Sequence, residues 1–471
     1  MEYPMHIGGK PVVTNRPVEV RLPYDGSEVA TVYEGDREEV EMAVAAAHRA
    51  APVMREMTLD QRASILRQVS DKVLARRDEL ATALSSESGK PIREALGEVD
   101  RASQTLLFSS EEAHRLCGEV VPMEAAPAGK GRWAMTLREP LGVIAAITPF
   151  NFPLNLAMHK IGPAIAAGNA VVHKPASATP VTALMLAAIF EECGLPPGAL
   201  NVVTGPGGVV GDLLVTHPRV AMITFTGSPE VGLRIRAMAG MKRVTLELGS
   251  NSAVIVDEDA DLEDAVPRCL TGSYANSGQV CISVQRIFAH ARIADEFTDR
   301  MVEGARKLKI GHPHDASTEI SSLITVKDAE RVESWIAEAA GAGARLLTGG
   351  LRRGATIEPA VLGSVPPQVK LSCQEAFGPV VAVNSCDGLD RAIEMVNASE
   401  YGLQAGIFTR DLHRAFSAAR RVHVGGFLIN DVPAYRVDQM PYGGVKLSGT
   451  GREGPKYAVE EMTEVKLVSW R

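Results

Sequence analysis

The sequence lacks the features that mark secreted, membrane-spanning or metal-binding chains. Its 471 residues include only six cysteines, and none forms a Cys-x-x-Cys pair or a cluster with histidine at metal-ligand spacing. We therefore expect reduced thiols, no metal centre and a cytoplasmic location. No basic segment followed by an apolar run opens the chain, which argues against a signal peptide. No uninterrupted apolar run reaches the ~20 residues that span a bilayer.

An excess of positive charge is also missing. Lysine and arginine number 49 against 57 aspartates and glutamates, a net charge of −8. This balance gives no electrostatic footprint for nucleic acid or for an anionic membrane. Hydrophobic residues make up 45% of the chain, which is enough to exclude disorder. A length of 471 residues predicts more than one domain, because single cores stop growing at roughly 250–300 residues.

The apolar spacing predicts an α/β protein. Residues 37–116 have the periodicity of helices, which we expect at Asp36–Ala47, Leu59–Ala75 and Ile92–His114. From Leu141 onward strands and helices alternate, as is typical of a parallel, doubly wound sheet. The expected strands are Val143–Ile147, Ala170–His173, Leu200–Val203, Met222–Phe225 and Arg243–Leu246. The expected helices are Pro153–Ala167, Pro180–Cys193, Val209–Thr216 and Pro229–Met238.

A second alternating set predicts a second α/β layer. It begins with a helix at Leu262–Tyr274 and a strand at Arg286–Ala289, followed by helices at Ala294–Leu308 and Val326–Ala342. Between the helical start of the chain and the first layer, Glu119–Leu137 has the alternation of a strand excursion.

Three loops after strands are candidates for nucleotide binding. The segment from Gly205 to Gly211 fails the G-x-G-x-x-G test at Val210, so we interpret it as a turn that leads into a helix. Phe225-Thr226-Gly227-Ser228 precedes a helix whose exposed amides could meet a pyrophosphate. Lys174 ends a strand, where ligands of open α/β sheets bind. Taken alone, each of these signals is at least as typical of a capped turn or a solvated lysine as of a nucleotide-binding site.

The segment Tyr274-Ala275-Asn276-Ser277-Gly278-Gln279-Val280-Cys281 resembles the nucleophile motif of the aldehyde dehydrogenase superfamily, and the resemblance extends along nearly the whole chain. Further matches occur in the family's order: Thr148-Pro149-Phe150-Asn151-Phe152-Pro153, Lys174-Pro175-Ala176-Ser177, Phe225-Thr226-Gly227-Ser228, Leu246-Glu247-Leu248-Gly249, Glu375-Ala376-Phe377-Gly378-Pro379 and the run from Pro441 to Gly449.

This resemblance implies a fold of three parts. They are a Rossmann-like cofactor domain of residues 1–118 and 141–247, an α/β catalytic domain of residues 248–440, and a small β oligomerisation element of residues 119–140 and 455–471. The strand-like run Val465–Trp470 suggests sheet extension between subunits of a homodimer or homotetramer.

The resemblance also implies a chemistry. Cys281 would attack an aldehyde to give a thiohemiacetal, which requires a lowered thiol pKa or a nearby base. The Asn151 side chain and the Cys281 backbone N–H would stabilise the oxyanion. Hydride transfer to NAD+ or NADP+ would leave a thioester, and Glu247 would activate water to hydrolyse it. The cofactor-binding residues implied by the resemblance are Thr148, Pro149, Phe150, Lys174, Ser177, Gly205, Phe225, Thr226, Gly227, Ser228, Leu248, Glu375 and Phe377.

One position bears on the choice of cofactor. Many relatives that prefer NAD carry a glutamate where Ser177 stands, and this carboxylate would repel the 2′-phosphate of NADP. Ser177 removes the repulsion, so we expect NADP to be tolerated.

The substrate class follows from a narrower resemblance. The segment from Arg436 to Tyr442 is similar to the branch that holds lactaldehyde, succinic semialdehyde, phosphonoaldehyde and non-phosphorylating glyceraldehyde-3-phosphate dehydrogenases. In relatives that use phosphate or phosphonate substrates, an arginine at the position of Arg101 binds the anionic tail. Further candidates for substrate-binding residues are Arg436, near the expected pocket mouth, and Phe152. Val280 replaces another arginine of the glyceraldehyde-phosphate enzymes. We expect a short aldehyde with an acidic tail, or alternatively a neutral hydroxyaldehyde such as lactaldehyde.

Other classes of function stay open at this point. Glu247 argues against the acylating, coenzyme-A-dependent branch, whose members often lack it. A non-catalytic structural or binding relative would be favoured by loss of Cys281 or Glu247, and both are present. A thiol-dependent acyl transferase or esterase would need Cys281 alone.

Overall fold

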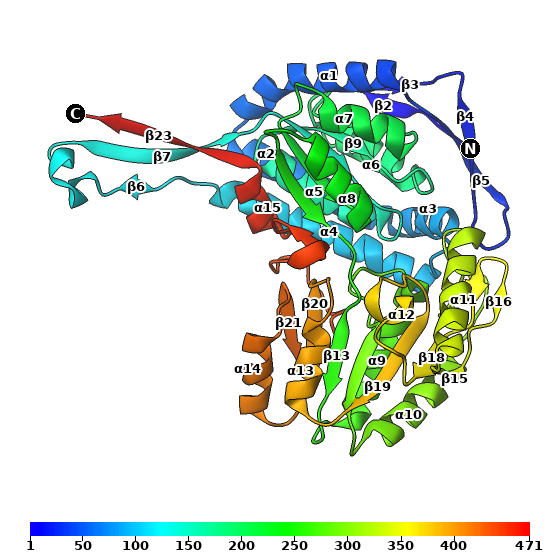
Figure 1. Ribbon diagram of the computed structural model, residues 1–471. Helices are drawn as coiled ribbons and strands as arrows, with labels where there is room; N and C mark the ends of the chain where they lie inside the picture. The colour runs from blue at the N-terminus through cyan, green and yellow to red at the C-terminus, as the bar shows by residue number, and fades with distance from the viewer.

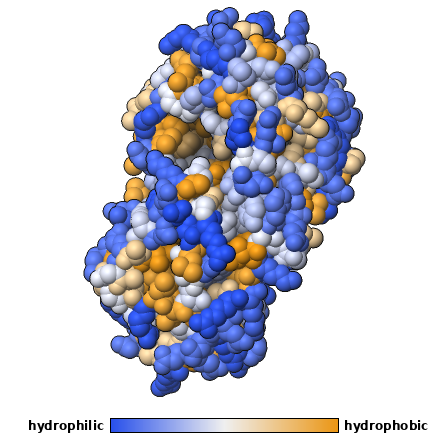
Figure 2. Space-filling view, turned by 90° about the vertical axis from the view of Figure 1, so that its right-hand side faces the viewer, coloured by the Kyte–Doolittle hydropathy of each residue, from blue (hydrophilic) through white to orange (hydrophobic).

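Two lobes, each built on its own sheet, make up the computed structural model, which describes residues 1–471 (Figure 1). A space-filling view shows the lobes meeting at a narrower middle (Figure 2). The sheet of the first lobe has the strand order β22-β12-β11-β8-β9-β10-β2-β3. Its inner strands are parallel: β8 (Val143–Ile147), β9 (Ala170–Lys174), β10 (Leu200–Val202), β11 (Met222–Thr226) and β12 (Arg243–Glu247). Its outer strands are antiparallel: β22 (Gly449–Thr450), β2 (Met5–Ile7) and β3 (Lys10–Val12).

Helices cover both faces of this sheet. They are α1 (Arg37–Glu56), α2 (Leu59–Ala75), α3 (Arg77–Ser88), α4 (Ile92–Arg115), α5 (Pro153–Ala166), α6 (Val181–Glu192), α7 (Asp212–Thr216), α8 (Pro229–Met238) and α15 (Pro455–Glu461). A small separate sheet is formed by β1 (Glu2–Tyr3), β4 (Pro17–Arg21) and β5 (Glu28–Tyr33).

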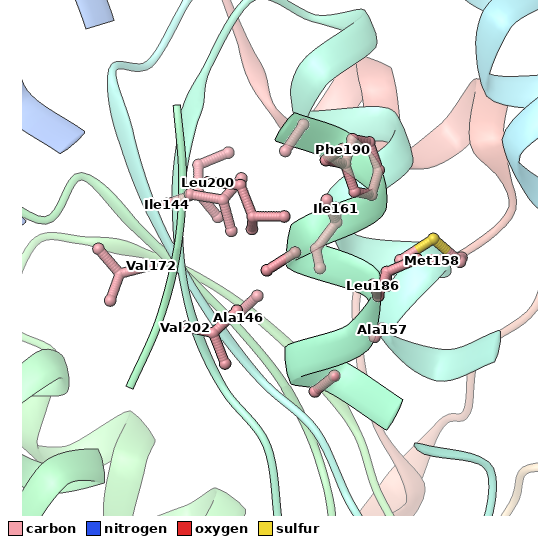
Figure 3. Packing of buried hydrophobic residues seen from close by; sticks show 14 of the residues in the cluster. Ile144, Ala146, Ala157, Met158, Ile161, Val172, Leu186, Phe190, Leu200 and Val202 are labelled. Atoms are coloured by element: carbon pink, nitrogen blue, oxygen red, sulfur yellow. The ribbon is translucent and has the colours of Figure 1, made fainter. Parts of the chain in front are cut away.

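The helix α5 lies at the centre of the first lobe and is buried all round. Ala157 and Ile161 point from it toward Ile144 and Ala146 of the sheet (Figure 3). Its other sides pack on α2, α4 and α6. Most of its side chains are apolar, and its polar Asn155, His159 and Lys160 have buried partners in Asp438 and Glu453, so α5 can lie between the sheet and the outer helices.

The second lobe contains a sheet with the order β15-β18-β19-β14-β13-β20-β21, parallel apart from β15. Its strands are β13 (Ala253–Val256), β14 (Arg286–His290), β15 (Arg345–Thr348), β18 (Ala360–Gly363), β19 (Val380–Cys386), β20 (Gln404–Phe408) and β21 (Gly426–Ile429). Its helices are α9 (Leu262–Tyr274), α10 (Ala294–Lys307), α11 (Val326–Gly341), α12 (Lys370–Cys373), α13 (Leu389–Asn397) and α14 (Leu412–Arg421), and a hairpin of β16 (Arg352–Arg353) and β17 (Thr356–Ile357) lies outside the sheet.

The expected elements agree with the structure except at three places. The first helix continues past Ala47 to Glu56, because Ala50 and Met54 extend its buried face while Pro52 lies on the exposed side. The helix α3 was not expected; Leu80, Ala81 and Leu84 bury one face of it behind a charged start. The helix expected at Val209–Thr216 is a π-helical turn over Gly207–Gly211 followed by the short α7.

The carboxyl ends of the parallel strands in the first sheet face the amino ends of the parallel strands in the second. The chain leaves the carboxyl end of β12 and enters the amino end of β13 after only five residues. Loops that follow the strands of the first sheet therefore meet loops that precede the strands of the second. This arrangement brings the segment after β8 and the end of β12 close to the segments that lead into β14 and β19.

A three-stranded arm projects from the first lobe (Figure 1). The expected strand excursion is β6 (Val120–Val121) and β7 (Trp133–Pro140), separated by two 3-10 turns at Met123–Ala125 and Pro127–Gly129. The strand β23 (Thr463–Trp470) pairs antiparallel with β7 along its whole length. No helix in the structure is both long enough and apolar enough to cross a membrane.

Candidate active site

A cavity of about 560 Å³ opens where the lobes meet. Phe152 and Arg101 line it from the first lobe, and Cys281 and Arg436 line it from the second. The partly exposed Cys281 thus faces a space large enough for a small organic molecule.

Cys281 follows a tight turn with an unusual backbone. Asn276 and Ser277 adopt φ angles of 49° and 55°, and Gly278 adopts 76°. A Cβ at Gly278 would lie 2.0 Å from the Gly378 carbonyl oxygen, so only glycine fits there. The sequence Asn-Ser-Gly suits this turn, because asparagine and glycine tolerate left-handed backbone better than other residues.

The surroundings of Cys281 disfavour the ionised form of its thiol. Burial raises its pKa to about 11, although a hydrogen bond with the Tyr442 hydroxyl, at 2.8 Å, acts in the opposite direction. We expected a lowered thiol pKa or a nearby base; the structure does not meet the first condition, and the second stays a prediction. Apolar surroundings outweigh the one hydrogen bond, and the sequence gives no measure of that balance.

Asn151 lies against the turn that carries Cys281. Its side-chain Nδ2 donates to the Gln279 carbonyl oxygen at 2.9 Å, and its own carbonyl oxygen accepts from Asn276 Nδ2 at 3.1 Å. The side-chain Oδ1 of the buried Asn151 has no partner. The structure thus brings Asn151 and the Cys281 segment together across the lobe boundary.

Glu247, at the end of β12, is a buried carboxyl group without a hydrogen-bond partner on either oxygen. Burial, followed by the neighbouring charge of Glu453, raises its pKa well above the usual range. A Cβ at Gly443 would lie 2.9 Å from Glu247 Oε1, so glycine at this position leaves space beside the carboxyl group. An unpaired acid at the lobe boundary is typical of a catalytic group rather than a structural one.

The Arg101 side chain is tied to a buried acid. Its Nη2 and Nε donate to Asp438 at 2.8 and 3.3 Å, while Nη1 has no partner and the side chain lines the cavity. Asp438 also accepts hydrogen bonds from Asn155 and His159. Burial opposes ionisation of Asp438, but His159 and Arg101 outweigh it and lower its pKa. Asp438 therefore holds the Arg101 guanidinium in one orientation.

Arg436 is not at the cavity mouth, where we expected it. Its side chain is only 6% exposed, forms an ion pair with Glu453 at 3.1 Å and lies 3.7 Å over the Tyr442 ring. The buried Lys160 donates to the same glutamate at 2.8 Å. Buried acids draw this guanidinium inward, which a linear sequence does not reveal.

The expected cofactor residues gather along the carboxyl edge of the first sheet. The Thr148 hydroxyl, after β8, lies 2.9 Å from His173 Nε2. Lys174, at the end of β9, is buried, and burial lowers its pKa to about 8. The exposed Ser177 donates its hydroxyl to the Gly205 carbonyl oxygen at 3.0 Å. These groups lie after the carboxyl ends of strands of the first sheet, where open α/β sheets bind ligands.

The remaining cofactor candidates border the same edge. Ser228 caps α8 by accepting from the Val231 N–H, at 3.4 Å, and follows Phe225, Thr226 and Gly227. From the second lobe Glu375 accepts from the backbone N–H of Ser250 at 3.0 Å, close to Leu248, and burial raises its pKa to about 7. Phe377, with a φ of 47°, packs edge-on against Phe150, which follows Pro149, at 5.8 Å between ring centres.

Sequence reasoning missed three side chains that contact this site. Tyr442 lies in the segment from Pro441 to Gly449 that we singled out, but its contact with Cys281 crosses 161 positions. Asp438 stands two residues after Arg436. Glu94, which accepts from the backbone N–H of Asn276 at 2.7 Å, stands four residues before Glu98 on the same helix. Spacing on the helix is the only sequence signal that points to Glu94.

The chain resembles known proteins along nearly its full length. The model of the aldehyde dehydrogenase family matches residues 12–468. A 3-sulfolactaldehyde dehydrogenase of Priestia aryabhattai is 49% identical over 99% of this chain and 98% of its own. A lactaldehyde dehydrogenase of Methanococcus aeolicus is 40% identical over 97% of each chain. The crystal structure of glyceraldehyde-3-phosphate dehydrogenase GapN from Methanocaldococcus jannaschii, complexed with NADP, has a TM-score of 0.93 at 40% identity and covers 97% of this chain and 100% of that one.

The raised pKa of Cys281 predicts slow, pH-dependent alkylation of the free protein. With a pKa of about 11, only about one thiol in a thousand is ionised at pH 8, and the rate should rise about tenfold per pH unit up to pH 10. Tyr442→Phe removes the hydrogen bond that lowers this pKa and should slow the reaction further. Iodoacetamide labelling followed by peptide mass spectrometry measures the rate, with the exposed Cys117 as internal reference. A Cys281 rate that is constant between pH 6 and 9 would contradict this pKa.

Proposed function

Because the chain belongs to the aldehyde dehydrogenase family, we propose that it oxidises a short hydroxyaldehyde with an anionic tail, foremost a sulfonate, to the carboxylic acid. Its general activity is that of an oxidoreductase acting on aldehydes with NAD+ or NADP+. One observation carries the finer proposal: Cys281 and the partner-free Nη1 of Arg101 line the same cavity of about 560 Å³.

Cys281 is the proposed nucleophile and Asn151 the proposed oxyanion donor. Loss of the thiol proton to solvent in the cavity gives a thiolate; its sulfur forms a bond to the aldehyde carbon, and the electrons of the C=O π bond move to the oxygen, which becomes an oxyanion. The Asn151 amide now donates to the Gln279 carbonyl oxygen and lies beside the Cys281 segment. Together with the Cys281 backbone N–H it can stabilise that charge without reorganising water.

The residues at the carboxyl edge of the first sheet fit a dinucleotide. The buried ammonium of Lys174 has only the Pro175 carbonyl oxygen as a partner, which leaves donors for ribose hydroxyls. Gly207 and Gly208 have open space where a Cβ would stand, so a phosphate can approach their backbone. When bound, the dinucleotide would supply the hydride acceptor; Glu375 would hold its nicotinamide ribose, and Phe377 would pack beside it.

Glu247 is the proposed base that hydrolyses the thioester on Cys281. Its carboxyl group has no partner, so a water molecule can occupy the place of one. A raised pKa keeps a carboxyl group protonated to higher pH than usual, and only the deprotonated form can take a proton from water. The hydrolytic step should therefore speed up as pH rises through that pKa.

Substitution of Glu247 tests the hydrolytic assignment. Glu247→Gln keeps the size of the side chain but removes the base, so we expect one rapid burst of reduced cofactor per active site followed by a steady rate at least 100-fold below that of the wild type. The rising limb of the wild-type pH profile should disappear. Stopped-flow absorbance at 340 nm measures both phases. Full steady-state turnover by the variant would refute the role of Glu247.

Arg101 is the proposed contact for the anionic tail of the substrate. Asp438 binds its Nε–Nη2 edge, and the remaining Nη1 can donate to a sulfonate, phosphate or carboxylate. The Arg101 side chain is 34% exposed, whereas that of Arg436 is 6% exposed and pairs with Glu453, which leaves only its buried Nε without a partner. Support also comes from the relatives named for 3-sulfolactaldehyde and glyceraldehyde 3-phosphate, both anionic. The relative named for lactaldehyde favours the neutral alternative.

The substrate proposal predicts a selective defect. Arg101→Ala should lower kcat/KM for 3-sulfolactaldehyde by about 30–100-fold, the worth of one charge-assisted hydrogen-bonded contact, and for lactaldehyde by less than threefold. Arg101→Lys, which keeps a charge beside Asp438, should show an intermediate loss. Arg93→Ala, an exposed arginine at the edge of the cavity, is the matched control. Equal losses for both aldehydes would exclude an anion contact at Arg101.

Ser177 predicts the cofactor range. Ser177→Glu should lower kcat/KM with NADP+ at least tenfold through repulsion of the 2′-phosphate, while changing that with NAD+ less than threefold. Ser177→Gln, neutral and similar in size, is the control and should retain NADP+ turnover. Initial rates over a range of each cofactor decide the matter. A wild-type chain without NADP+ turnover at high concentration would show that Ser177 does not confer tolerance.

The arm supports a homodimer or homotetramer. Trp133 is 63% exposed and Leu467 is 57% exposed, and β23 has no partner on its outer edge. An exposed edge strand with apolar side chains is completed by another strand, here from a second copy of the chain. The six free cysteines fit a reducing compartment such as the cytoplasm.

A further inference from the structure

One face of α4 contacts three separate segments of the candidate active site. The helix runs along the boundary between the lobes (Figure 1). Glu94, Glu98 and Arg101 follow each other at intervals of four and three residues, so their side chains share one face. Each reaches a different segment: the turn before Cys281, the start of α5 after Asn151, and the loop that carries Asp438.

The contact made by Glu98 fixes the segment that contains Asn151. Phe152, the residue before α5, offers no side-chain cap. Glu98 Oε1 caps the helix instead, by accepting hydrogen bonds from the backbone N–H groups of Leu154 and Asn155 at 2.9 and 3.1 Å. The buried Lys90 pairs with Glu98 and lies 3.7 Å over the Phe152 ring. The position of Asn151 is therefore set from α4.

The contact made by Glu94 crosses to the second lobe. Its Oε2 accepts from the backbone N–H of Asn276 at 2.7 Å. Asn276 holds the left-handed φ of 49°, and its side chain donates to the carbonyl oxygens of Asn151 and Gln279. A chain of hydrogen bonds thus runs from α4 through Asn276 to Asn151, around the residues that precede Cys281.

The helix that carries these groups is itself anchored. Ala95, Val99, Ala102 and Leu106 are fully buried on it and belong to the core of the first lobe. Because the backbone of this helix is fixed by its buried face, the length of the Glu94 side chain determines the position of the turn that contains Asn276.

We propose that Glu94 is a positioning residue that fixes Cys281 relative to Asn151. Its hydrogen bond to Asn276 ties α4 to the turn that precedes Cys281. The proposal rests on the roles proposed above for Cys281 and Asn151. Glu94 acts through its reach and its acceptor oxygen. Its negative charge is not the property required, since the group that it holds is a neutral backbone N–H.

Two substitutions separate reach from charge. Glu94→Gln keeps the length and an acceptor oxygen but loses the charge, while Glu94→Asp keeps the charge but withdraws the carboxylate by one methylene group. Glu111→Asp is the control, because Glu111 lies on the same helix, faces solvent and pairs only with Arg115. The readouts are the rate of the first burst of reduced cofactor, the affinity for NADP+ by titration, and the alkylation rate of Cys281 by iodoacetamide.

We expect Glu94→Asp to lower the burst rate at least tenfold, while its affinity for NADP+ stays within twofold of that of the wild type. For Glu94→Gln we expect the burst rate and the NADP+ affinity to stay within threefold of the wild-type values. Glu111→Asp should match the wild type. A Glu94→Asp burst within twofold of the wild type overturns the proposal, as does a Glu94→Gln loss equal to that of Glu94→Asp. A wild-type chain without aldehyde oxidation refutes the proposed function instead. The alkylation rates then decide alone: unchanged reactivity of Cys281 in Glu94→Asp overturns the positioning role.

Discussion

The hydrogen bonds between Asn151 and the turn from Asn276 to Gln279 are the constraint on which the site depends. They join a loop that follows a strand of the first sheet to a loop that precedes a strand of the second. Neither loop could hold its position alone, because the turn has a left-handed backbone at two residues that are not glycine. The opposed sheet edges make the meeting possible, and the surrounding core keeps it in place.

Charge burial follows from the same geometry. A lobe boundary lined with polar loops encloses ionisable side chains, and an unpaired buried charge costs several kcal/mol, of order 3–5 when one partner of a pair is removed. Asp438 and Glu453 avoid this cost through His159, Lys160 and their arginine partners. Glu247 has no such partner and stays protonated more readily as a result. The contrast divides the acids into those that hold the site together and one that is free to exchange a proton.

Local sequence was sufficient for most of the elements. Val143–Ile147, Pro229–Met238 and Leu262–Tyr274 have the bounds expected from apolar runs, a serine cap with proline, and helical spacing. The short helix α3 and the π-helical turn before α7 were missed, since their form depends on what packs against them. In the site, ordered motifs placed Asn151, Glu247 and Cys281 at the ends of neighbouring elements. The raised thiol pKa and the inward turn of Arg436 were not predictable, because both depend on burial among residues distant in sequence.

The pairing of β7 with β23 joins residues 133–140 to residues 463–470. During synthesis at about 5–20 residues per second, β7 is complete on the order of tens of seconds before β23 exists. In that interval one backbone edge of β7 is unpaired, and its apolar side chains, Trp133 among them, are exposed. An exposed edge strand of this kind favours aggregation. Closure of such a distant pair is also slow by topology. The arm is therefore among the last parts of the fold to form, because its central strand waits for β23.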